Sequence, residues 1–540
     1  MTFDLVIKGG FVADGTGGPR FRADVGVCGD KIAALGRLSD GRTTVDASGL
    51  VVAPGFIDTH NHADHGILRC PDAQNFIAQG ITTSVCGNCG LSLTPLSDAH
   101  REALAGYMAP FVGTAPEYNW TWDDFSSFAQ RVEAAQPAQN LALLTGHGTL
   151  RAAVMGFENR PPAEDELDRM KALLDREFEQ GAAGLSFGLA YPPGCYAKRR
   201  EIAALLSVAA RRGRRCAFHL ESESTAVVGC VDAVLDAART TGAAVEISHH
   251  KAIGRENWGK VFETLRAMER ARTEGVDVLC DAYPYVAGST TILSLLPAWA
   301  AEGGMEALLA RLRDETQRRR IADAILKDEA PGDNLTLLQG WERILIGGCP
   351  ADRTCEGRTL ADLLSHPGQP AHRVDAESIG AFMDWLLSVE GRALMVLLDE
   401  QSEEDLRHVL AHPLTALGSD AWAVRLGEGC PHPRAYGTTA RLLGRFVRDE
   451  RLLELEEAVR KMTAAPARRY GIAGRGLIAE GLFADLVVFD PVTIRDCGDF
   501  LDPHRRPEGI CAVAVNGILA MRDGELTADR AGRVLRLRPN

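Results

Sequence analysis

The chain has 540 residues, of which 46% are hydrophobic and 24% are charged, as in ordinary globular proteins. This composition excludes a mainly disordered chain and a coiled coil, and the length suits one large domain with one or two small ones. Lys and Arg number 59 and Asp and Glu number 73, which gives a net charge of −14. Because this acidic chain carries no basic block, we expect neither a nucleic-acid partner nor a membrane partner.

Two features predict the cellular compartment. The amino-terminal residues include an early Asp4 and lack an apolar stretch of the signal-peptide type. The 13 cysteines are odd in number and scattered, which favours a reducing environment over a disulfide framework. We therefore predict a cytoplasmic protein.

The two ends of the chain share a pattern of short strands separated by Gly and Asp turns. Strand-like runs lie at 3–8, 23–27 and 31–35 near one end, and at 484–490 and 511–515 near the other. We predict that residues 1–54 and 478–540 together form one small β domain of the β-sandwich type. Such a domain would place the two termini together.

Between these ends, apolar strand candidates alternate with helical patterns, which is typical of an α/β fold with a buried parallel sheet. Eight such strands are the number that a (β/α)₈ TIM barrel needs, and we predict a barrel over residues 55–477. The strand candidates are 55–58, 81–85, 141–144, 183–187, 216–218, 245–247, 276–279 and 415–418.

Two further apolar runs, 344–346 and 394–398, lie between the seventh and eighth strand candidates. We interpret residues 288–400 as an insertion that also carries helices. The alternative is a doubly wound sheet of ten strands, in which both runs join the main sheet.

Potential metal ligands follow several of the strand candidates. His60 and His62 follow the first strand at a spacing of two, which lets both imidazoles bind one ion. Cys89, His219 and Asp420 follow the second, fifth and eighth strands. Because catalytic groups of barrels gather at the carboxyl ends of the strands, this pattern predicts a transition-metal site.

Three choices stay open on spacing alone. Cys86 and Cys89 form a Cys-x-x-Cys pair, but a second pair of a structural zinc site is absent, and Cys89 is the better single ligand. His249 and His250 lie on opposite faces of the sixth strand, so one of them points inward. His147 follows the third strand and either lines the site or has a structural role.

The sequence resembles the N-acyl-D-amino-acid deacylases (D-aminoacylases) of the amidohydrolase superfamily. The resemblance covers nearly the whole chain in order, and it starts from the first-strand motif that contains His60 and His62. The matching stretches are 54–62, 87–90, 146–151, 188–194, 247–251, 281–285, 418–420, 432–438, 484–490 and 507–510.

The resemblance implies a barrel of the metallo-dependent hydrolase type, flanked by a small β domain, and it maps one ligand onto His249. It further implies a tight Zn²⁺ site and a second, weaker site, with the thiolate of the cysteine able to bridge them. The implied ligands are Cys89, His219 and His249 for the tight site, and His60, His62 and Asp420 for the weaker one. Many members of the superfamily bridge their metals with a carbamylated lysine on the fourth strand, but residues 181–189 contain no lysine.

The implied activity is zinc-dependent hydrolysis of a small-molecule substrate, an N-acyl-D-amino acid, to a carboxylate and a D-amino acid. Zinc activates water at neutral pH and polarises the amide carbonyl, and Asp420 is the candidate general base that protonates the leaving amine. Family position implies that the substrate carboxylate is bound by Lys251, Tyr283, Arg434 and the neighbouring Tyr191. We therefore expect a locally basic pocket.

Two departures from the family pattern bear on the substrate. The basic run 198–200 indicates either a preference for an acidic side chain or a solvated helix start. Ala421 and Trp422 follow Asp420, where the family usually has Gly. The alternative functions are a cyclic amide hydrolase of the hydantoinase or dihydroorotase type and an inactive barrel protein. The presence of all six candidate ligands argues against the inactive protein. The sequence leaves open whether the chain forms a homo-oligomer.

Overall fold

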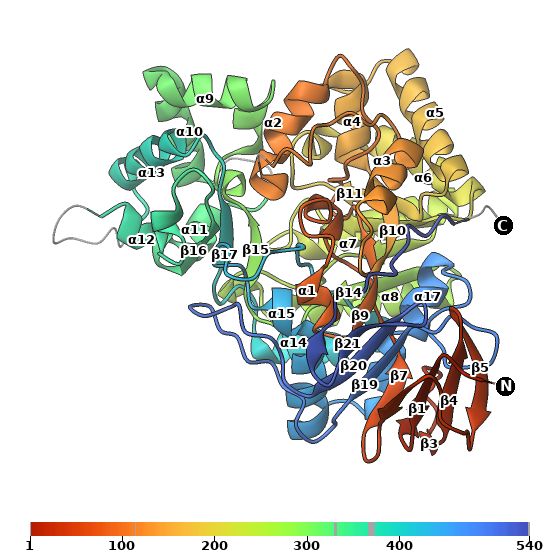
Figure 1. Ribbon diagram of the computed structural model, residues 1–540. Helices are drawn as coiled ribbons and strands as arrows, with labels where there is room; N and C mark the ends of the chain where they lie inside the picture. Colours follow the sequence, from red (N-terminus) through yellow and green to blue (C-terminus); the bar gives the residue numbers. More distant parts are fainter. Residues whose placement is uncertain (1, 114, 329–331, 366–372, 538–540) are drawn as a thin grey trace.

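The computed structural model describes residues 2–113, 115–328, 332–365 and 373–537 (Figure 1). Its central sheet has eight parallel strands, and each strand pairs with the next one along the barrel sequence. The amide of Thr59 donates to the carbonyl of Leu417 at 3.3 Å, which joins the first strand to the last. The predicted (β/α)₈ barrel is confirmed. The strands are β8 (Phe56–Asp58), β9 (Ile81–Cys86), β10 (Asn140–Gly146), β11 (Gly184–Gly188), β12 (Arg215–His219), β13 (Val245–Ile247), β14 (Val278–Ala282) and β18 (Thr415–Leu417).

Amphipathic helices cover the outside of this sheet. In α5 (Glu164–Gln180) the side chains of Leu167, Met170, Leu174 and Phe178 are buried at helical spacing against the sheet. Acidic residues occupy the first turn of α5, where their negative charges interact favourably with the positive end of the helix dipole. The other covering helices include α4 (His147–Met155), α6 (Arg199–Arg211), α7 (Val227–Thr241) and α8 (Lys260–Thr273).

The two ends of the chain form two further sheets at the lower right of Figure 1, one of amino-terminal strands alone and one that combines strands from both ends. The link is the antiparallel pairing of β7 (Val51–Pro54) with β19 (Leu486–Phe489). Val25 of one sheet and Val52 and Leu486 of the other are buried in one cluster, so the sheets pack as a sandwich. The remaining strands are β1 (Leu5–Lys8), β2 (Phe11–Val12), β3 (Phe21–Arg22), β4 (Asp24–Cys28), β5 (Lys31–Gly36), β6 (Thr43–Asp46), β20 (Ile510–Val515), β21 (Ile518–Arg522) and β22 (Glu525–Leu526).

The last described residues leave the sandwich and cross to the barrel. Val534 bridges to Leu141 of β10, and the amide of Leu537 donates to the carbonyl of Gly181 at 2.9 Å. Leu537 and Tyr470 of α17 (Ala464–Tyr470) pack in one cluster with barrel residues such as Ala142. The last described residues therefore lie against the barrel rather than in the sandwich (Figure 1), and the expectation that the two termini lie together stays a prediction.

The stretch between β14 and β18 builds a separate layer at the upper left of Figure 1. Its strands β15 (Gly288–Thr291), β16 (Ile344–Gly348) and β17 (Leu394–Leu397) pair antiparallel in a three-stranded sheet. The alternative of a ten-stranded sheet is therefore wrong. The domain limits at 54/55 and 477/478 and the insertion limits at 288–400 stay predictions. The helices of this layer are α9 (Met305–Arg313), α10 (Glu315–Lys327), α11 (Leu335–Gln339), α12 (Leu360–Leu363) and α13 (Ala376–Ser388).

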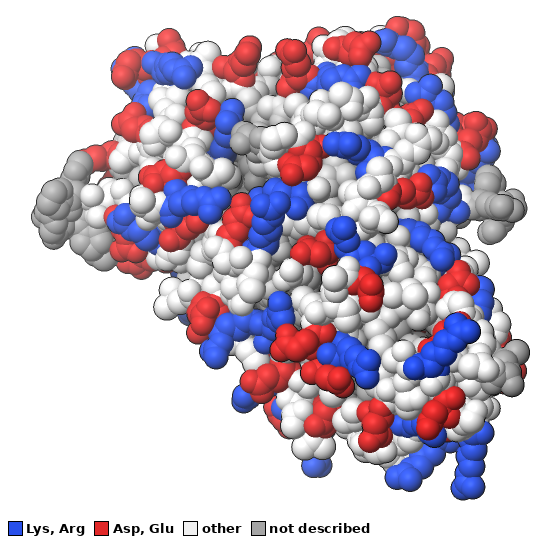
Figure 2. Space-filling model, in the orientation of Figure 1, with Lys and Arg blue, Asp and Glu red and all other residues white. Residues whose placement is uncertain are grey.

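The distribution of surface charge and the hydrophobicity of the helices are relevant to nucleic-acid and membrane partners. Acidic and basic side chains are interspersed over the face shown in Figure 2. Among the described helices none is long and apolar enough to cross a membrane.

Candidate metal centre and substrate pocket

Six buried side chains that could hold a metal converge at the carboxyl ends of the barrel strands. They form two groups, and within each group the ligand atoms lie within 4.8 Å of one another. One group is His60, His62, Cys89 and Asp420, and the other is Cys89, His219 and His249. The structure thus brings together all six residues that were predicted as ligands, and Cys89 belongs to both groups.

Cys89 lies at the centre of this cluster. Its Sγ lies 3.4 Å from the Nε2 of His60 and 3.5 Å from the Nε2 of His249. The ring of His219 completes this side, with its Nδ1 2.9 Å from the Nε2 of His249. On the other side, the Nε2 of His62 lies 3.2 Å from the Oδ1 of Asp420.

Two carboxylates that the sequence analysis did not identify as site residues contact the back of the imidazoles. The Nδ1 of His60 lies 3.3 Å from the Oδ2 of Asp281, and the Nδ1 of His249 lies 2.9 Å from the Oε1 of Glu223. Such contacts are typical of metal-binding histidines, because they fix the ring orientation and leave Nε2 free for the ion. Asp281 lies within β14 and Glu223 follows β12, so their positions at strand ends were the signal that could have identified them.

The ionisation of the cluster suits a metal ion. Burial opposes ionisation of the Cys89 thiol, but His60, His219 and His249 outweigh it and hold the pKa of Cys89 well below its ordinary value. A thiolate surrounded by imidazoles and a carboxylate is a donor set that zinc and similar ions prefer. The residues present therefore fit a metal centre.

The backbone of the cluster adopts an uncommon conformation. Cys89, His249 and Asp420 have φ values of 54°, 34° and 53°, in the left-handed region that favours glycine. Backbone packing is also tight, because a Cβ added to Gly188 would lie 1.9 Å from the carbonyl oxygen of Cys89. Strained residues of this kind tend to cluster at functional sites.

The structure shows which of the alternatives left by the residue spacing lie outside the two ligand groups. His250 points away from the cluster, with its Nε2 2.8 Å from the hydroxyl of Thr264. Cys86 is fully buried, and burial raises the pKa of its thiol well above the ordinary value. His147 contacts the Glu201 carboxylate at 2.8 Å in a buried network outside both ligand groups.

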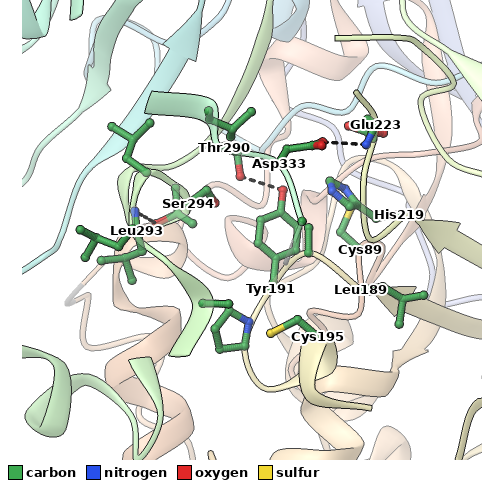
Figure 3. A pocket seen from close by; sticks show the side chains of 18 of the residues that line it. Cys89, Leu189, Tyr191, Cys195, His219, Glu223, Thr290, Leu293, Ser294 and Asp333 are labelled. Carbon is green, nitrogen blue, oxygen red and sulfur yellow. Dashed lines mark hydrogen bonds between the residues drawn. The ribbon is translucent and has the colours of Figure 1, made fainter. Parts of the chain in front are cut away.

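A cavity of about 400 Å³ opens over the metal cluster and extends under the insertion. Figure 3 shows Cys89 and His219 on one side of it and Leu293 and Ser294 on the other. Tyr191 lies between them, and its hydroxyl forms a 2.8 Å hydrogen bond with Thr290. The volume falls in the range of ordinary small-molecule sites.

The four predicted carboxylate-binding residues lie at different depths. Lys251, Tyr283 and Tyr191 line the cavity, and the Nζ of Lys251 pairs with Glu223 at 2.7 Å. Arg434 is fully buried and is not among the residues that line the cavity. Its guanidinium instead lies 2.9 Å from the Oδ2 of Asp420.

The charge of the cavity differs from the expectation. Lys198 and Lys251 are its two basic lining residues, whereas five acidic side chains line it, so the described cavity is not locally basic. The acidic residues are Glu221, Glu223, Asp333, Glu400 and Asp420.

The residues that depart from the family pattern lie in different parts of the structure. Lys198 lines the cavity, but Arg200 at the start of α6 is exposed and pairs with Glu164. The ring of Trp422 stacks on the ring of His62, with centroids 5.3 Å apart. Trp422 therefore forms a wall of the cavity beside a candidate metal ligand.

Comparisons with known proteins agree with this arrangement. A model of the amidohydrolase family matches residues 43–520. A D-aminoacylase from Alcaligenes xylosoxydans is 37% identical over 535 residues, which cover 99% of this chain and 97% of that protein. An N-acyl-D-glutamate deacylase of the same organism is 38% identical over 99% of this chain and 96% of its own length.

A solved structure gives the same result. The N-acyl-D-glutamate deacylase of Bordetella bronchiseptica, determined with zinc and a phosphonate inhibitor, superposes with a TM-score of 0.83 and 35% identity. The match covers 99% of this chain and all of the other. The family match and the two relatives show that the chain, with its cluster of candidate ligands at the carboxyl ends of the barrel strands, belongs to the amidohydrolase family.

Proposed function

We propose that this protein hydrolyses N-acyl-D-amino acids to a carboxylate and a free D-amino acid. The observation that carries the proposal is the buried cluster of a thiolate, four imidazoles and a carboxylate that faces a cavity containing Lys251 and Tyr283. Two relatives that match nearly the whole chain are named D-aminoacylase and N-acyl-D-glutamate deacylase.

The metal in this proposal is zinc. Cys89, His219 and His249 would hold the tight ion, while His60, His62 and Asp420 would hold a second, weaker one. A zinc ion held there would polarise the amide carbonyl and would lower the pKa of bound water toward neutrality. Cys89 belongs to both ligand groups, and in this proposal one tightly held ion would suffice for activity.

Asp420 is the proton carrier in this proposal. It accepts a proton from the attacking water and donates it to the leaving amine, which is a poor leaving group unless it is protonated. Arg434 and His62 outweigh burial and hold the pKa of Asp420 well below its ordinary value, so it starts as a carboxylate. The ion pair with Arg434 also fixes the orientation of the carboxylate.

Lys251 and Tyr283 are proposed to bind the α-carboxylate, with Tyr191 and Arg434 supporting the same end of the substrate. When the carboxylate and the acyl carbonyl are both fixed, the side chain of one enantiomer has a single direction open to it. Trp422 limits this space beside His62. A preference for one enantiomer follows from this three-point arrangement, and the names of the relatives support the D-enantiomer.

A cyclic amide hydrolase is the alternative within the same superfamily. Enzymes of the hydantoinase type resemble the chain at His60 and His62, but they typically use a carbamylated lysine on the fourth strand. That strand, β11, contains no lysine. The cytoplasmic location and the oligomeric state stay predictions.

An assay of amine release tests the proposal. Purified protein of known zinc content is incubated with matched pairs of N-acetyl-D- and N-acetyl-L-amino acids that carry apolar, acidic and basic side chains. We expect release from the D-substrates, with an acidic side chain gaining no special preference because acidic residues outnumber lysines in the cavity. The absence of amine release from every D-substrate by zinc-loaded protein would refute the proposal. Hydantoin and dihydropyrimidine substrates test the alternative in a separate assay that detects the ring-opened N-carbamoyl product by chromatography, since ring opening releases no amine.

A further inference from the structure

A buried acid that the proposed mechanism does not use lies in the wall of the cavity. Glu400 lies in the loop between β17 and α14 (Glu403–Ala411), is 3% exposed and lines the cavity. Its Oε2 has no hydrogen-bond partner among the described residues. A buried acid oxygen without a partner is costly unless a ligand supplies one.

The surrounding backbone holds Glu400 in this position. The amide of Gly254 donates to the carbonyl of Glu400 at 3.1 Å, and the amide of Gln401 donates to Val286 at 3.1 Å. The carboxyl lies against Gly288, where an added Cβ would be 2.1 Å from the Oε2 of Glu400. A glycine at position 288 therefore provides the space that the carboxyl occupies.

The charged groups that face Glu400 come from several elements. Lys251 and His249 follow β13, Glu223 follows β12, and Arg434 begins α15 (Arg434–Arg441). The positive charges of Lys251 and Arg434 are already paired, with Glu223 at 2.7 Å and with Asp420 at 2.9 Å. Burial, opposed by Lys251, raises the pKa of Glu400 to about 7, so both of its protonation states are accessible near neutrality.

Glu400 lines the same cavity as Lys251 and Tyr283, the residues that the proposed function assigns to the substrate carboxylate. Its charge acts on the pKa of both residues. Two carboxylates that lie side by side in a buried site cannot both be ionised at low cost, and the stable arrangement shares one proton. A substrate carboxylate in this place therefore favours the protonated form of Glu400.

We infer that Glu400 is a specificity-determining residue that, in its protonated form, donates a hydrogen bond to the α-carboxylate of the substrate next to Lys251 and Tyr283. Binding of the substrate then takes up a proton at Glu400, and ionised Glu400 repels the substrate. This inference rests on the proposed function, because it takes the α-carboxylate as the group that occupies this end of the cavity.

The first test is the pH dependence of KM for N-acetyl-D-leucine with the zinc enzyme. Because ionisation of Glu400 weakens binding, we expect KM to rise about tenfold from pH 6 to pH 8. Glu400→Gln keeps a hydrogen-bond donor that does not ionise, so its KM should stay near the low-pH value of the unchanged protein across this range. The control Glu404→Gln removes an exposed acid nearby and should leave the profile unchanged.

Two outcomes overturn the inference. One is a Glu400→Gln protein that keeps the pH dependence of KM seen in the unchanged protein. The other is a Glu400→Gln protein whose KM at pH 6 exceeds that of the unchanged protein by tenfold or more, but only for substrates with a basic side chain. Glu400 would then act as an anion that binds the cation of the substrate. If Glu400→Gln does not fold, Gly288→Ala displaces the same carboxyl and should raise KM at pH 6.

A second measurement does not depend on turnover. The zinc enzyme is titrated calorimetrically with D-leucine at pH 7.5 in two buffers of different ionisation enthalpy, which reports the protons taken up on binding. The unchanged protein should take up more protons than Glu400→Gln, by about half a proton or more. Equal proton uptake by the two proteins contradicts the role of Glu400, whereas loss of amine release from every D-substrate contradicts the proposed function.

Discussion

Cys89 and Asp420 have separable tasks, although both lie in one cluster. Cys89 belongs to both candidate ligand groups, whereas Asp420 belongs to one of them and carries the ion pair with Arg434. Their left-handed backbone costs about 1–3 kcal/mol each, a cost that the surrounding packing must offset. Side-chain chemistry, rather than local preference, therefore explains why these residues occupy these positions.

Substitution of the two residues should separate metal binding from turnover. Cys89→Ala removes a ligand from both groups, so we expect loss of tightly bound zinc together with activity. Asp420→Ala leaves Cys89, His219 and His249 in place, so it should retain one zinc per chain and lose about 10²–10⁴-fold in kcat. Metal analysis after dialysis, combined with steady-state kinetics, checks both. An unchanged zinc content in Cys89→Ala would show that Cys89 is not a ligand.

At the scale of elements, strand ends and their following loops decide where each ligand points. The loop after β9 carries Cys89 directly against the end of β11, where Gly188 leaves room for the Cys89 carbonyl. His60 and His62 lie beyond the end of β8. A Cβ added to Gly418, which follows β18, would lie 2.6 Å from the Cβ of His60. Close backbone approach, rather than the strands alone, therefore sets the geometry of the cluster.

Gly188→Ala tests this close approach. The added Cβ would lie 1.9 Å from a backbone oxygen, so the loop that carries Cys89 must move. We expect a loss of stability of about 1–3 kcal/mol and weaker zinc binding, measured by thermal unfolding and metal titration. Gly229→Ala in α7 is the matched control, because an added Cβ there meets no atom within 4 Å. Equal zinc affinity in the two variants would contradict the explanation.

At the scale of the whole molecule, the cluster of candidate metal ligands places many ionisable groups in the interior. Asp281, Glu223 and Asp420 are buried around the imidazoles and the Cys89 thiolate. Asp281 contacts His60 and Asp420 contacts His62, and both pairs join residues that are distant in the sequence. A bound ion would therefore link several barrel strands and stabilise the native state over the unfolded one.

Removal of zinc should lower the thermal midpoint of the protein. At a free zinc concentration one hundred times the Kd, binding stabilises the folded state by about 2.7 kcal/mol, less any binding to the unfolded chain. A chelator should lower Tm and added zinc should restore it, as followed by calorimetry. Cys89→Ala should show a much smaller response, and a Tm that is independent of the chelator in the unchanged protein would speak against a resident metal.

The sequence by itself was sufficient for the barrel strands and for the ligand types. The apolar runs and the residues that end them, such as His60, His62 and Asp420, are local patterns, and parallel strands bring their carboxyl ends to one edge. The choice of His249 over His250 came from resemblance, since spacing alone left it open. The structure agrees, because His249 lies at the cluster and His250 contacts Thr264.

Only the tertiary structure decided which polar groups meet one another. Glu223 and Asp281 orient the imidazoles, Arg434 contacts Asp420 from outside the cavity lining, and Glu400 reaches the site from the insertion. These contacts join residues of different strands and loops, and no local pattern specifies such pairs. Long-range packing also determines the path of the carboxyl-terminal segment, because Leu537 packs in one cluster with residues of the barrel strands. Local patterns determined the elements and the donor types, whereas long-range packing determined their partners and their charge states.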